Sequence, residues 1–341
     1  MATIKEIADL AGVSRGTVDR VLNKRGSVNP QTAQKIMEIV HALDYKPNRA
    51  GLVLAAQKKN LKLGVILFGE GNPFFDEVTD GIRQKEEDLA CYNCTVQIKR
   101  VNVDTLEQLQ AIDEFVKEGI NGIAISPTND PRLARRIDEL FEQGIPVVAL
   151  NTDIKNCKRI AFVGSNYYQS GATAAGLMRL MAKNESTKIG IVTGSEEILC
   201  HTERIAGFTN AIQSYPNIDI VATITNDDDD FVSYDRTTRL LTEHPEINAL
   251  FFAAAGVYGG CRAALAMRGQ KKDMTIITFD KVATTKEMVA KDVISATICQ
   301  EPLVQGSKPL DILFSYLATG DLPKSEYNYT AVDIRIKENM D

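Results

Sequence analysis

The sequence predicts a small all-α helix-turn-helix headpiece joined by a hinge to an α/β core of two doubly wound lobes. Three observations support this fold class. Helical apolar spacing fills the N-terminal part, buried strand runs alternate with amphipathic helices after residue 60, and that alternation restarts halfway along the chain. We therefore assign residues 1–46 to the headpiece, 47–60 to the hinge and 61–341 to the core.

Two short helices with a tight turn between them are predicted at the start of the chain. The first has apolar residues on one face over Ile4–Ala11, and Gly12 can end it because glycine adopts a left-handed backbone without strain. Ser14 is a good N-cap for a second helix over Arg15–Leu22. This arrangement is typical of a helix-turn-helix, whose second helix reads the DNA major groove, although these residues alone also fit an ordinary helical hairpin.

A third helix is expected to complete the headpiece. Asn29 and Pro30 form a helix start, with asparagine as N-cap and proline at the first helical position. Lys46 precedes Pro47, and a residue before proline is driven toward extended conformations, so the helix must end before it. The segment 48–56 is too short to be a stable helix alone and is expected to fold only on DNA or against a partner.

The core is expected to contain two similar lobes. Buried strands that alternate with helices form right-handed parallel β-α-β units. We assign an N-lobe to about 61–165 plus 301–323 and a C-lobe to about 166–300 plus 324–335. Because ligands bind at the carboxyl ends of such strands, a binding cleft is expected between the lobes. The predicted strands are 63–68, 95–101, 120–126, 146–151, 161–165, 188–193, 218–224, 249–253, 275–279 and 294–298.

The composition is that of an ordinary globular protein with a charge asymmetry. Of the 341 residues, 44% are hydrophobic and 25% are charged. Residues 1–59 hold ten Lys and Arg against five Asp and Glu, whereas the remainder holds 29 against 40. A basic head on an acidic body suits a DNA-binding module attached to a second function. No export leader and no apolar run of about 18 residues is evident, so we expect a cytoplasmic protein without membrane contact.

The residue pattern does not indicate an enzyme or a metalloprotein. No glycine-rich phosphate loop follows the first strand, and no matched nucleophile or base accompanies the histidines. Cys91 and Cys94 have the spacing of a redox or metal pair, but no second pair and no nearby histidine completes a site. The acidic run 227–230 lacks the ligand spacing of a calcium loop and is expected to be a solvated loop. We therefore expect no catalytic residue, no cofactor and no metal.

The first residues and the hinge carry motifs of a known family. Residues 3–23, T-I-K-E-I-A-D-L-A-G-V-S-R-G-T-V-D-R-V-L-N, resemble the signature A-x-x-A-G-V-S-x-x-T-V-S-R-V-L-N of the LacI–GalR family of transcriptional regulators. Residues 45–49, Y-K-P-N-R, followed by Leu54 and Ala55, resemble the hinge of that family. The resemblance implies a sequence-specific DNA-binding regulator that acts as a repressor.

The resemblance implies base contacts, phosphate contacts and a wedge. Arg15, Gly16 and Arg20 take the base-facing positions, where arginine can form two hydrogen bonds with guanine. Leu54 takes the position of an apolar wedge that opens a base step in the minor groove, the alternative being a buried helix contact. Asp19 replaces the usual serine and is expected to alter the phosphate contacts. The other expected DNA-binding residues are Ser14, Thr17 and Asn23 at phosphates and Asn48 in the hinge.

The core resembles a periplasmic sugar-binding fold of the ribose and galactose type. Asn72, Phe74 and Phe75 match a loop whose asparagine bonds hydroxyls and whose aromatic ring stacks on a sugar face. Arg204 matches the family's ligand arginine, which can bond two hydroxyls or a carboxylate. Asn151 stands where sugar binders commonly carry aspartate, for which Asp153 is expected to substitute. The remaining expected effector contacts are Asp280 and Gln300.

The resemblance implies a homodimer that binds a pseudo-palindromic operator under the control of a small effector. That effector is expected to be a sugar, a polyol or a sugar phosphate. Ala254 and Ala255 replace a common Asn-Asp pair at the cleft, which removes two polar contacts. Two alternatives remain open: a solute-binding protein without a DNA function, and a regulator whose effector cleft is degenerate.

Overall fold

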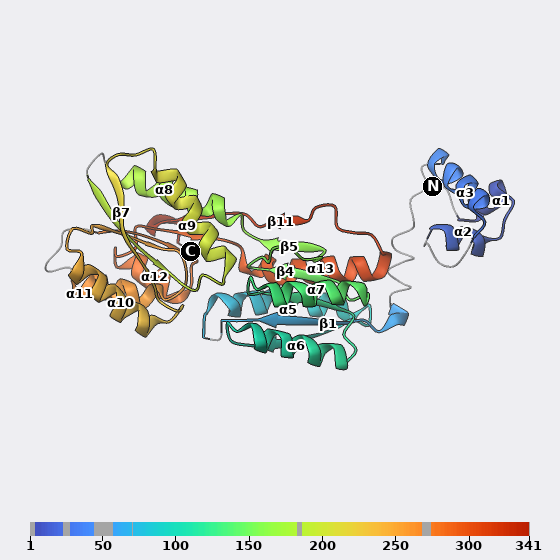
Figure 1. The fold of residues 1–341 in the computed structure, drawn as a ribbon, viewed down its shortest axis with the longest axis horizontal. Coiled ribbons are helices and arrows are strands. Elements are labelled where there is room, and N and C mark those ends of the chain that lie inside the picture. Colours follow the sequence, from blue (N-terminus) through green and yellow to red (C-terminus); the bar gives the residue numbers. More distant parts are fainter. Residues whose placement is uncertain are drawn as a thin grey trace.

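The structure, a computed structural model, describes residues 4–22, 28–43, 57–69, 71–182, 186–267 and 274–340, without the side chains of Asp19 and Lys58. These residues form a helical headpiece and a core of two α/β lobes (Figure 1). The strands predicted for the core are confirmed to within a few residues, and both sheets are built mainly from parallel pairs. The predicted fold class is therefore confirmed.

Three helices pack around a small apolar core in the headpiece. They are α1 (Ile4–Ala11), α2 (Arg15–Leu22) and α3 (Pro30–Ala42). Gly12 ends α1 with a φ of 72°, and the backbone N–H of Thr17 donates to Ser14 Oγ at 3.1 Å, which makes Ser14 the predicted cap of α2. Ile7, Val18 and Ile36 bring one fully buried side chain from each helix.

The N-lobe is a six-stranded sheet with helices on both faces. The strand order is β11-β5-β4-β3-β1-β2. Helices α5 and α13 pack together over one face, and α6 and α7 cover the other (Figure 1). Its elements are β1 (Lys62–Leu67), α5 (Phe74–Ala90), β2 (Thr95–Arg100), α6 (Thr105–Lys117), β3 (Gly122–Ile125), α7 (Pro131–Glu142), β4 (Val147–Leu150), β5 (Ala161–Gly164), α13 (Pro302–Thr319) and β11 (Tyr327–Tyr329).

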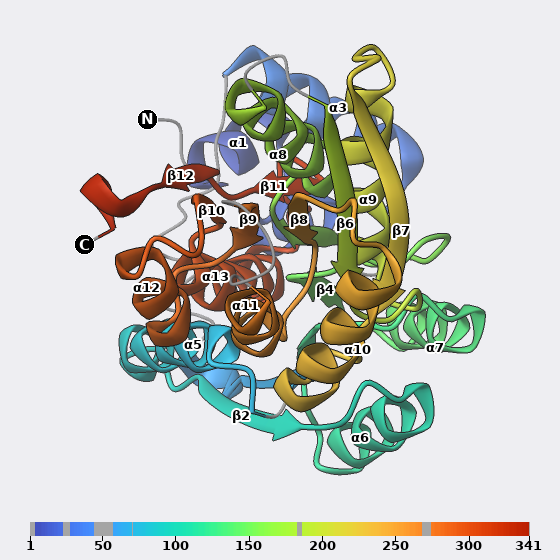
Figure 2. The same cartoon turned by 90° about the vertical axis from the view of Figure 1, so that its left-hand side faces the viewer.

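The C-lobe repeats this plan with the strand order β12-β10-β9-β8-β6-β7, and Figure 2 views the molecule from this end. Helices α8 and α9 pack on one face and α10, α11 and α12 on the other. Its elements are α8 (Tyr167–Met181), β6 (Thr187–Thr193), α9 (Leu199–Ile212), β7 (Ile218–Thr225), α10 (Asp230–Glu243), β8 (Ala249–Phe252), α11 (Val257–Ala266), β9 (Thr275–Phe279), α12 (Ala283–Ala290), β10 (Ala296–Cys299) and β12 (Asp333–Arg335).

Helices α8 and α9 are in unusually close contact because each carries a glycine at the crossing. A Cβ atom on Gly171 would lie 1.9 Å from the carbonyl oxygen of Arg204, and one on Gly207 would lie 1.9 Å from that of Tyr168. Both glycines are therefore required by backbone approach. The contact fixes the position of α9, which carries Arg204 to the region between the lobes.

The chain crosses between the lobes after β5, after β10 and after β11. The assignment of 324–335 to the C-lobe is wrong for β11, which pairs in parallel with β5 at the edge of the N-lobe sheet. Only β12 joins the C-lobe, as an antiparallel partner of β10. A three-residue edge strand has too little pattern to indicate which sheet it extends. Among the described residues, no helix is both long enough and apolar enough to cross a membrane.

Candidate functional site

The outer face of α2 presents most of the residues predicted to contact DNA. Ser14, Arg15, Gly16 and Arg20 are exposed. Ser14 Oγ lies 3.0 Å from Thr17 Oγ1, and Arg20 Nε donates to the carbonyl oxygen of Gly16 at 3.1 Å. The arginine side chains of this face are thus held on a helix whose opposite side is buried, as groove reading requires. The predicted contacts Asn23, Asn48 and Leu54 lie outside the described residues.

A cavity of about 550 Å³ lies between the two lobes, where the carboxyl ends of the parallel strands meet. Its N-lobe wall comes from the loops after β1, β2 and β4, and its C-lobe wall from α9 and the loops after β7, β8, β9 and β10. The structure brings together at this cavity all but one of the predicted effector contacts: Asn72, Phe74, Phe75, Asn151, Arg204, Asp280 and Gln300. The exception is Asp153.

The N-lobe wall is aromatic. Asn72 Oδ1 accepts a hydrogen bond from the backbone N–H of Phe74 at 3.0 Å, which starts α5 next to the cavity. The ring of Phe75 meets Phe68 and Phe74 edge to face, at centroid distances of 5.4 and 5.3 Å. Gly69 has a φ of 80°, and a Cβ there would lie 2.7 Å from the Phe75 ring. The first strand and its loop therefore fix the aromatic face before any ligand is present.

Asn151 joins this wall to the inter-lobe connections. It has a φ of 62° and is 6% exposed. Its Nδ2 donates to Gln305 Oε1 at 3.2 Å, Gln305 Nε2 donates to the carbonyl oxygen of Gln300 at 2.8 Å, and its own carbonyl accepts from the hydroxyl of Tyr167. The amide that replaces the aspartate usual in sugar binders thus takes part in a buried polar network that spans two crossovers.

Arg204 is the central cation of the cavity. It is 4% exposed, its Nη1 donates to the carbonyl oxygen of Ala253 at 2.8 Å, and its Nη2 donates to Gln300 Oε1 at 3.1 Å. The guanidinium carbon lies 3.8 Å from the centroid of the Phe279 ring, a cation–π contact. Its buried Nε has no hydrogen-bond partner among the described residues.

Asp280 completes a polar chain with Arg204. Gln300 Nε2 donates to Asp280 Oδ1 at 2.9 Å, so the Gln300 amide connects the guanidinium and the carboxylate. Burial raises the pKa of Asp280 to about 6, while the charge of Arg204 and the Gln300 hydrogen bond act in the opposite direction. This chain offers a ligand both donors and an acceptor on one surface.

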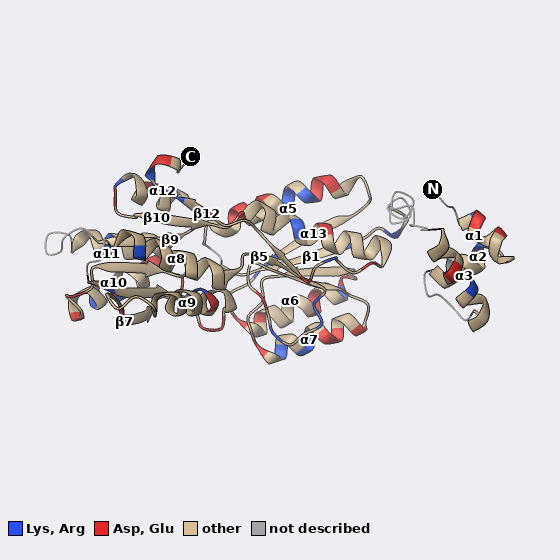
Figure 3. Ribbon diagram, turned by 90° about the horizontal axis from the view of Figure 1, so that it is seen from above, with Lys and Arg blue, Asp and Glu red and all other residues tan. Residues whose placement is uncertain are grey.

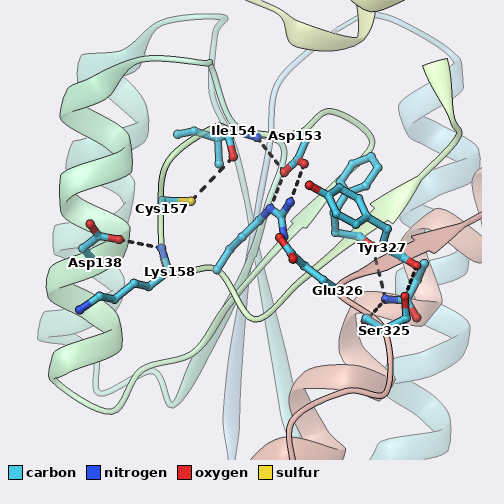
Figure 4. A network of polar contacts seen from close by, with 11 residues as sticks. Asp138, Asp153, Ile154, Cys157, Lys158, Ser325, Glu326 and Tyr327 are labelled. Atoms are coloured by element: carbon cyan, nitrogen blue, oxygen red, sulfur yellow. Dashed lines mark hydrogen bonds and ion pairs between the residues drawn. The ribbon is translucent and has the colours of Figure 1, made fainter. Parts of the chain in front are cut away.

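Asp153 does not reach the cavity, so its prediction as an effector contact is wrong. Figure 4 shows the network that holds it. Arg159 Nε lies 2.5 Å from Asp153 Oδ1 and Arg159 Nη2 lies 2.6 Å from Oδ2, while Arg159 Nη1 binds Glu326 at 3.0 Å. The arginine is almost fully buried and also faces the ring of Tyr327 at 5.1 Å. Asp153 therefore anchors the C-terminal segment to the N-lobe.

Asp228 and His201 line the cavity, although neither was among the predicted effector contacts. Asp228 Oδ1 accepts from the backbone N–H of Ala255 at 2.9 Å, and His201 Nε2 lies 4.0 Å from the same oxygen. Asp227, Asp229 and Asp230 are exposed, as expected of a solvated loop, whereas Asp228 is half-buried, and all four residues of the run line the cavity. The run directly follows strand β7, and that position was the available signal.

Comparison with known proteins separates the same two parts of the chain. Residues 63–321 match the family model described as periplasmic binding protein domain, and residues 3–48 match the model of bacterial regulatory proteins, lacI family. A ribose operon repressor of Halalkalibacterium halodurans is 25% identical over 89% of this chain and 86% of its own length. A probable HTH-type transcriptional repressor ExuR of Bacillus subtilis is 28% identical over 83% of this chain and 82% of its own length.

Solved structures resemble the core. The arabinose binding protein AraP of Geobacillus stearothermophilus is 27% identical with a TM-score of 0.68, and the alignment covers 82% of this chain and 98% of that one. A solute binding protein of Burkholderia graminis in complex with D-arabinose has a TM-score of 0.76 at 24% identity, over 82% of this chain and 96% of its own, and shows the shared fold.

A helix-turn-helix headpiece on a two-lobed binding fold with a polar cleft defines a ligand-binding DNA regulator. The chain belongs, over residues 63–321, to the periplasmic binding protein domain family, and residues 3–48 form a DNA-binding domain of the lacI family of bacterial regulatory proteins. It is a DNA-binding transcriptional regulator, and the two regulators named above align with it over more than four fifths of their own length.

Proposed function

We propose that this regulator is a homodimeric repressor whose operator affinity is set by a small polyhydroxylated effector, a sugar or a polyol, bound in the cavity between the lobes. The observation that supports this proposal is the cavity itself. One wall is aromatic and contains Phe74 and Phe75, and it faces a polar chain formed by Arg204, Gln300 and Asp280. An aromatic face opposite clustered donors and acceptors suits a ring with an apolar face and a hydroxylated rim. The relatives named for ribose and arabinose support the same ligand class.

The effector would act through the angle between the lobes. Ligand contacts with both walls favour a closed cleft, and closing changes how the two N-lobes of a dimer present their headpieces to a pseudo-palindromic site. A coupling of this kind typically amounts to about 1–3 kcal/mol. Binding to chromosomal DNA places the protein in the cytoplasm.

A gel-shift titration with promoter fragments tests the DNA-binding part of this proposal. The full chain should bind selected fragments in a salt-dependent manner, since phosphate contacts release counterions. Arg15→Ala should reduce binding to the selected fragment about tenfold while non-specific binding changes less, because a bidentate base contact is worth about 1–3 kcal/mol. Lys5→Ala, also exposed on the headpiece but on α1, is the matched control. A chain that shifts no promoter fragment at low salt contradicts the proposal.

A further inference from the structure

The C-lobe wall of the cavity carries an excess of carboxylates. Its lining residues include the four aspartates of the run 227–230 together with Asp280, against the cation Arg204 and the imidazole of His201. Charges of both signs also lie along α5 and α7, with six acidic and two basic residues in α5 and three of each in α7 (Figure 3). What distinguishes the cavity wall is that its carboxylates gather where a ligand would bind.

Most of these carboxylates are already satisfied by the protein. Asp227 Oδ2 lies 2.9 Å from Arg236 Nη2, and Asp229 caps α10 by accepting the backbone N–H groups of Phe231 and Val232 at 2.8 Å each. Asp230 Oδ1 accepts from the backbone N–H of Gly259 at 2.9 Å. Three of the four carboxylates in the run are therefore already engaged in contacts within the protein.

Asp228 is different because it is the one partly buried carboxylate of the run, and none of the described residues brings a permanent cation close to it. Its Oδ1 receives one backbone hydrogen bond, from Ala255, and the described side chains bring only His201 Nε2 within 4.0 Å. That distance is too long for a hydrogen bond, and His201 Nδ1 lies 3.3 Å from the carbonyl oxygen of Ser195. The Asp228 carboxylate therefore depends on cavity water in the empty protein.

The surrounding backbone holds this carboxylate in place. Asn226 Nδ2 donates to the carbonyl oxygen of Ala255 at 2.7 Å, and Asp228 accepts from the N–H of the same residue, so the loop after β7 is docked on the loop after β8. Ala254 and Ala255 have no polar side chains to fill the space beside it. Asp228 thus supplies the polar group that the alanine pair lacks, and it supplies a charged one.

Closing the cleft over a ligand removes the water on which Asp228 depends. A carboxylate that loses its water without gaining a partner is strongly unfavourable, so an effector that closes this cleft must bring hydrogen-bond donors to Asp228, and a cationic donor compensates its charge best. Arg204 is directed elsewhere, because one N–H of Nη1 bonds Ala253 and one N–H of Nη2 bonds Gln300. Its remaining N–H groups can meet a phosphate or carboxylate ligand, but such an anion would also face the five aspartates of this wall.

We propose that the effector carries a protonated amine that binds Asp228, which makes it an amino sugar or an amino polyol and disfavours sugar phosphates and sugar acids. This inference rests on the proposed function and narrows its ligand class. The aromatic wall at Phe74 and Phe75 would hold the ring or chain of the effector, and Asp228 would read its ammonium group.

The test compares matched probes by thermal shift on the full chain, since a ligand that binds only the folded state raises stability. Three sets each contain a parent sugar, its 2-amino derivative and its 6-phosphate, with D-glucose, D-galactose or D-mannose as the parent. A fourth set pairs D-glucitol with 1-amino-1-deoxy-D-glucitol. In at least one set the amine should bind ten- to hundredfold more tightly than the parent, and the phosphates should give no shift. A panel without any such amine preference overturns the proposal.

Two variants connect the preference to Asp228. Asp228→Asn keeps the shape and removes the charge, so the affinity for the preferred amine should fall at least tenfold while the affinity for its parent stays within about threefold. Asp235→Asn removes a charge from an exposed position of α10 outside the cavity and should keep the preference. Retention of the preference in Asp228→Asn would overturn the assignment.

Gly194→Ala gives an independent check that leaves the carboxylate in the sequence. A Cβ on Gly194 would lie 2.6 Å from both Asp228 Oδ2 and His201 Cε1 and must displace both side chains, so the amine preference should be lost although the charge remains. An unchanged preference would contradict the geometry. The gel shift with promoter DNA is scored separately, so a chain that binds DNA and responds only to neutral sugars retains the proposed function while the amine inference fails.

Discussion

The two walls of the inter-lobe cavity differ in kind. The described residues of the N-lobe wall are aromatic, aliphatic or amide-bearing, as in Phe75, Val103 and Asn151, and none of them is charged. The C-lobe wall holds Arg204, His201 and five aspartates. A flat apolar wall makes similar contacts with any ring, whereas charged groups discriminate strongly between ligands. The comparison indicates that the N-lobe wall provides affinity for a class of molecules and the C-lobe wall selects within it.

The walls also differ in how they are held. The N-lobe wall is held by ring contacts among Phe68, Phe74 and Phe75. The C-lobe wall is held by hydrogen bonds between polar groups, among them the chain from Arg204 through Gln300 to Asp280. A polar chain of this kind can exchange its internal partners for ligand atoms, and the C-lobe wall is therefore the one whose energy changes most on binding.

Removing Arg204 should have the largest effect. Arg204→Ala is expected to weaken effector binding about 100-fold or more, because it removes charge-assisted hydrogen bonds and leaves Gln300 and Ala253 without their donor. Thermal shift with the tightest-binding probe measures the loss. Operator affinity without effector should stay within about twofold in a gel shift.

Arg239→Ala is the matched control for this variant, since Arg239 lies exposed on α10 in a surface pair with Asp235. It should change neither effector response nor operator binding. A response in Arg204→Ala equal to that of wild type would move the effector site away from this cavity.

The N-lobe wall could be predicted from sequence far better than the C-lobe wall. Asn72, Phe74 and Phe75 follow a strand directly and sit in a short motif whose position in the sheet is fixed by β1. Asp228 is the partly buried residue of its run, and Asp227 and Asp228 both adopt left-handed backbone, with φ values of 56° and 57°. Four identical residues in a row carry no signal for which one turns inward.

Asp153 shows the opposite error. It lies two residues after Asn151, which does line the cavity, but Arg159 binds both of its carboxylate oxygens. That pairing depends on how the loop after β4 folds back and on Glu326, which comes from the far end of the chain. The position of Asp153 close after Asn151 suggests a cavity contact, but a partner from a distant part of the chain holds it elsewhere. Sequence spacing alone does not reveal such a tertiary contact.

Changing the aromatic wall should affect all ligands alike. Phe75→Leu is expected to reduce affinity about fivefold for amine and parent sugars equally, since it removes a stacking surface worth about 1 kcal/mol without altering charge. Phe115→Leu, another buried N-lobe phenylalanine that does not line the cavity, controls for lost packing and should leave affinity unchanged. If affinity falls only for the charged probes, the N-lobe wall also discriminates between ligands, which contradicts the assignment of that role to the C-lobe wall.

The polar wall should lower the stability of the empty protein. Burial raises the pKa of Asp280 from 3.8 to about 6. Between these pH values the folded state therefore keeps the carboxyl proton, whereas the unfolded state has released it. Stability from this residue is therefore highest at low pH and falls as the pH rises toward 6. Asp280→Asn should remove this slope and be more stable than wild type by about 1 kcal/mol at pH 7.5, less than the full shift because the side chain is partly exposed.

Thermal unfolding of ligand-free protein between pH 5 and 7.5 measures that difference. Asp235→Asn removes a carboxylate outside the cavity and should retain the wild-type slope. An Asp280→Asn variant less stable than wild type at pH 7.5 would show that the Gln300 hydrogen bond outweighs desolvation, and the C-lobe wall would then be no less stable than the aromatic one.

The smallest effect is expected at Phe231, the one aromatic residue of the described C-lobe rim with its ring in solvent. It is 87% exposed at the first turn of α10 and lines the mouth of the cavity. Phe231→Ala should leave the stability of the empty protein within about 0.5 kcal/mol, because a solvent-exposed ring has little packing to lose. If the ring covers the ligand when the lobes close, affinity should fall about threefold for amine and parent alike. An unchanged affinity would show that the Phe231 ring does not cover the ligand, which leaves the buried Phe279 and the partly buried Tyr258 as the aromatic C-lobe residues lining the cavity.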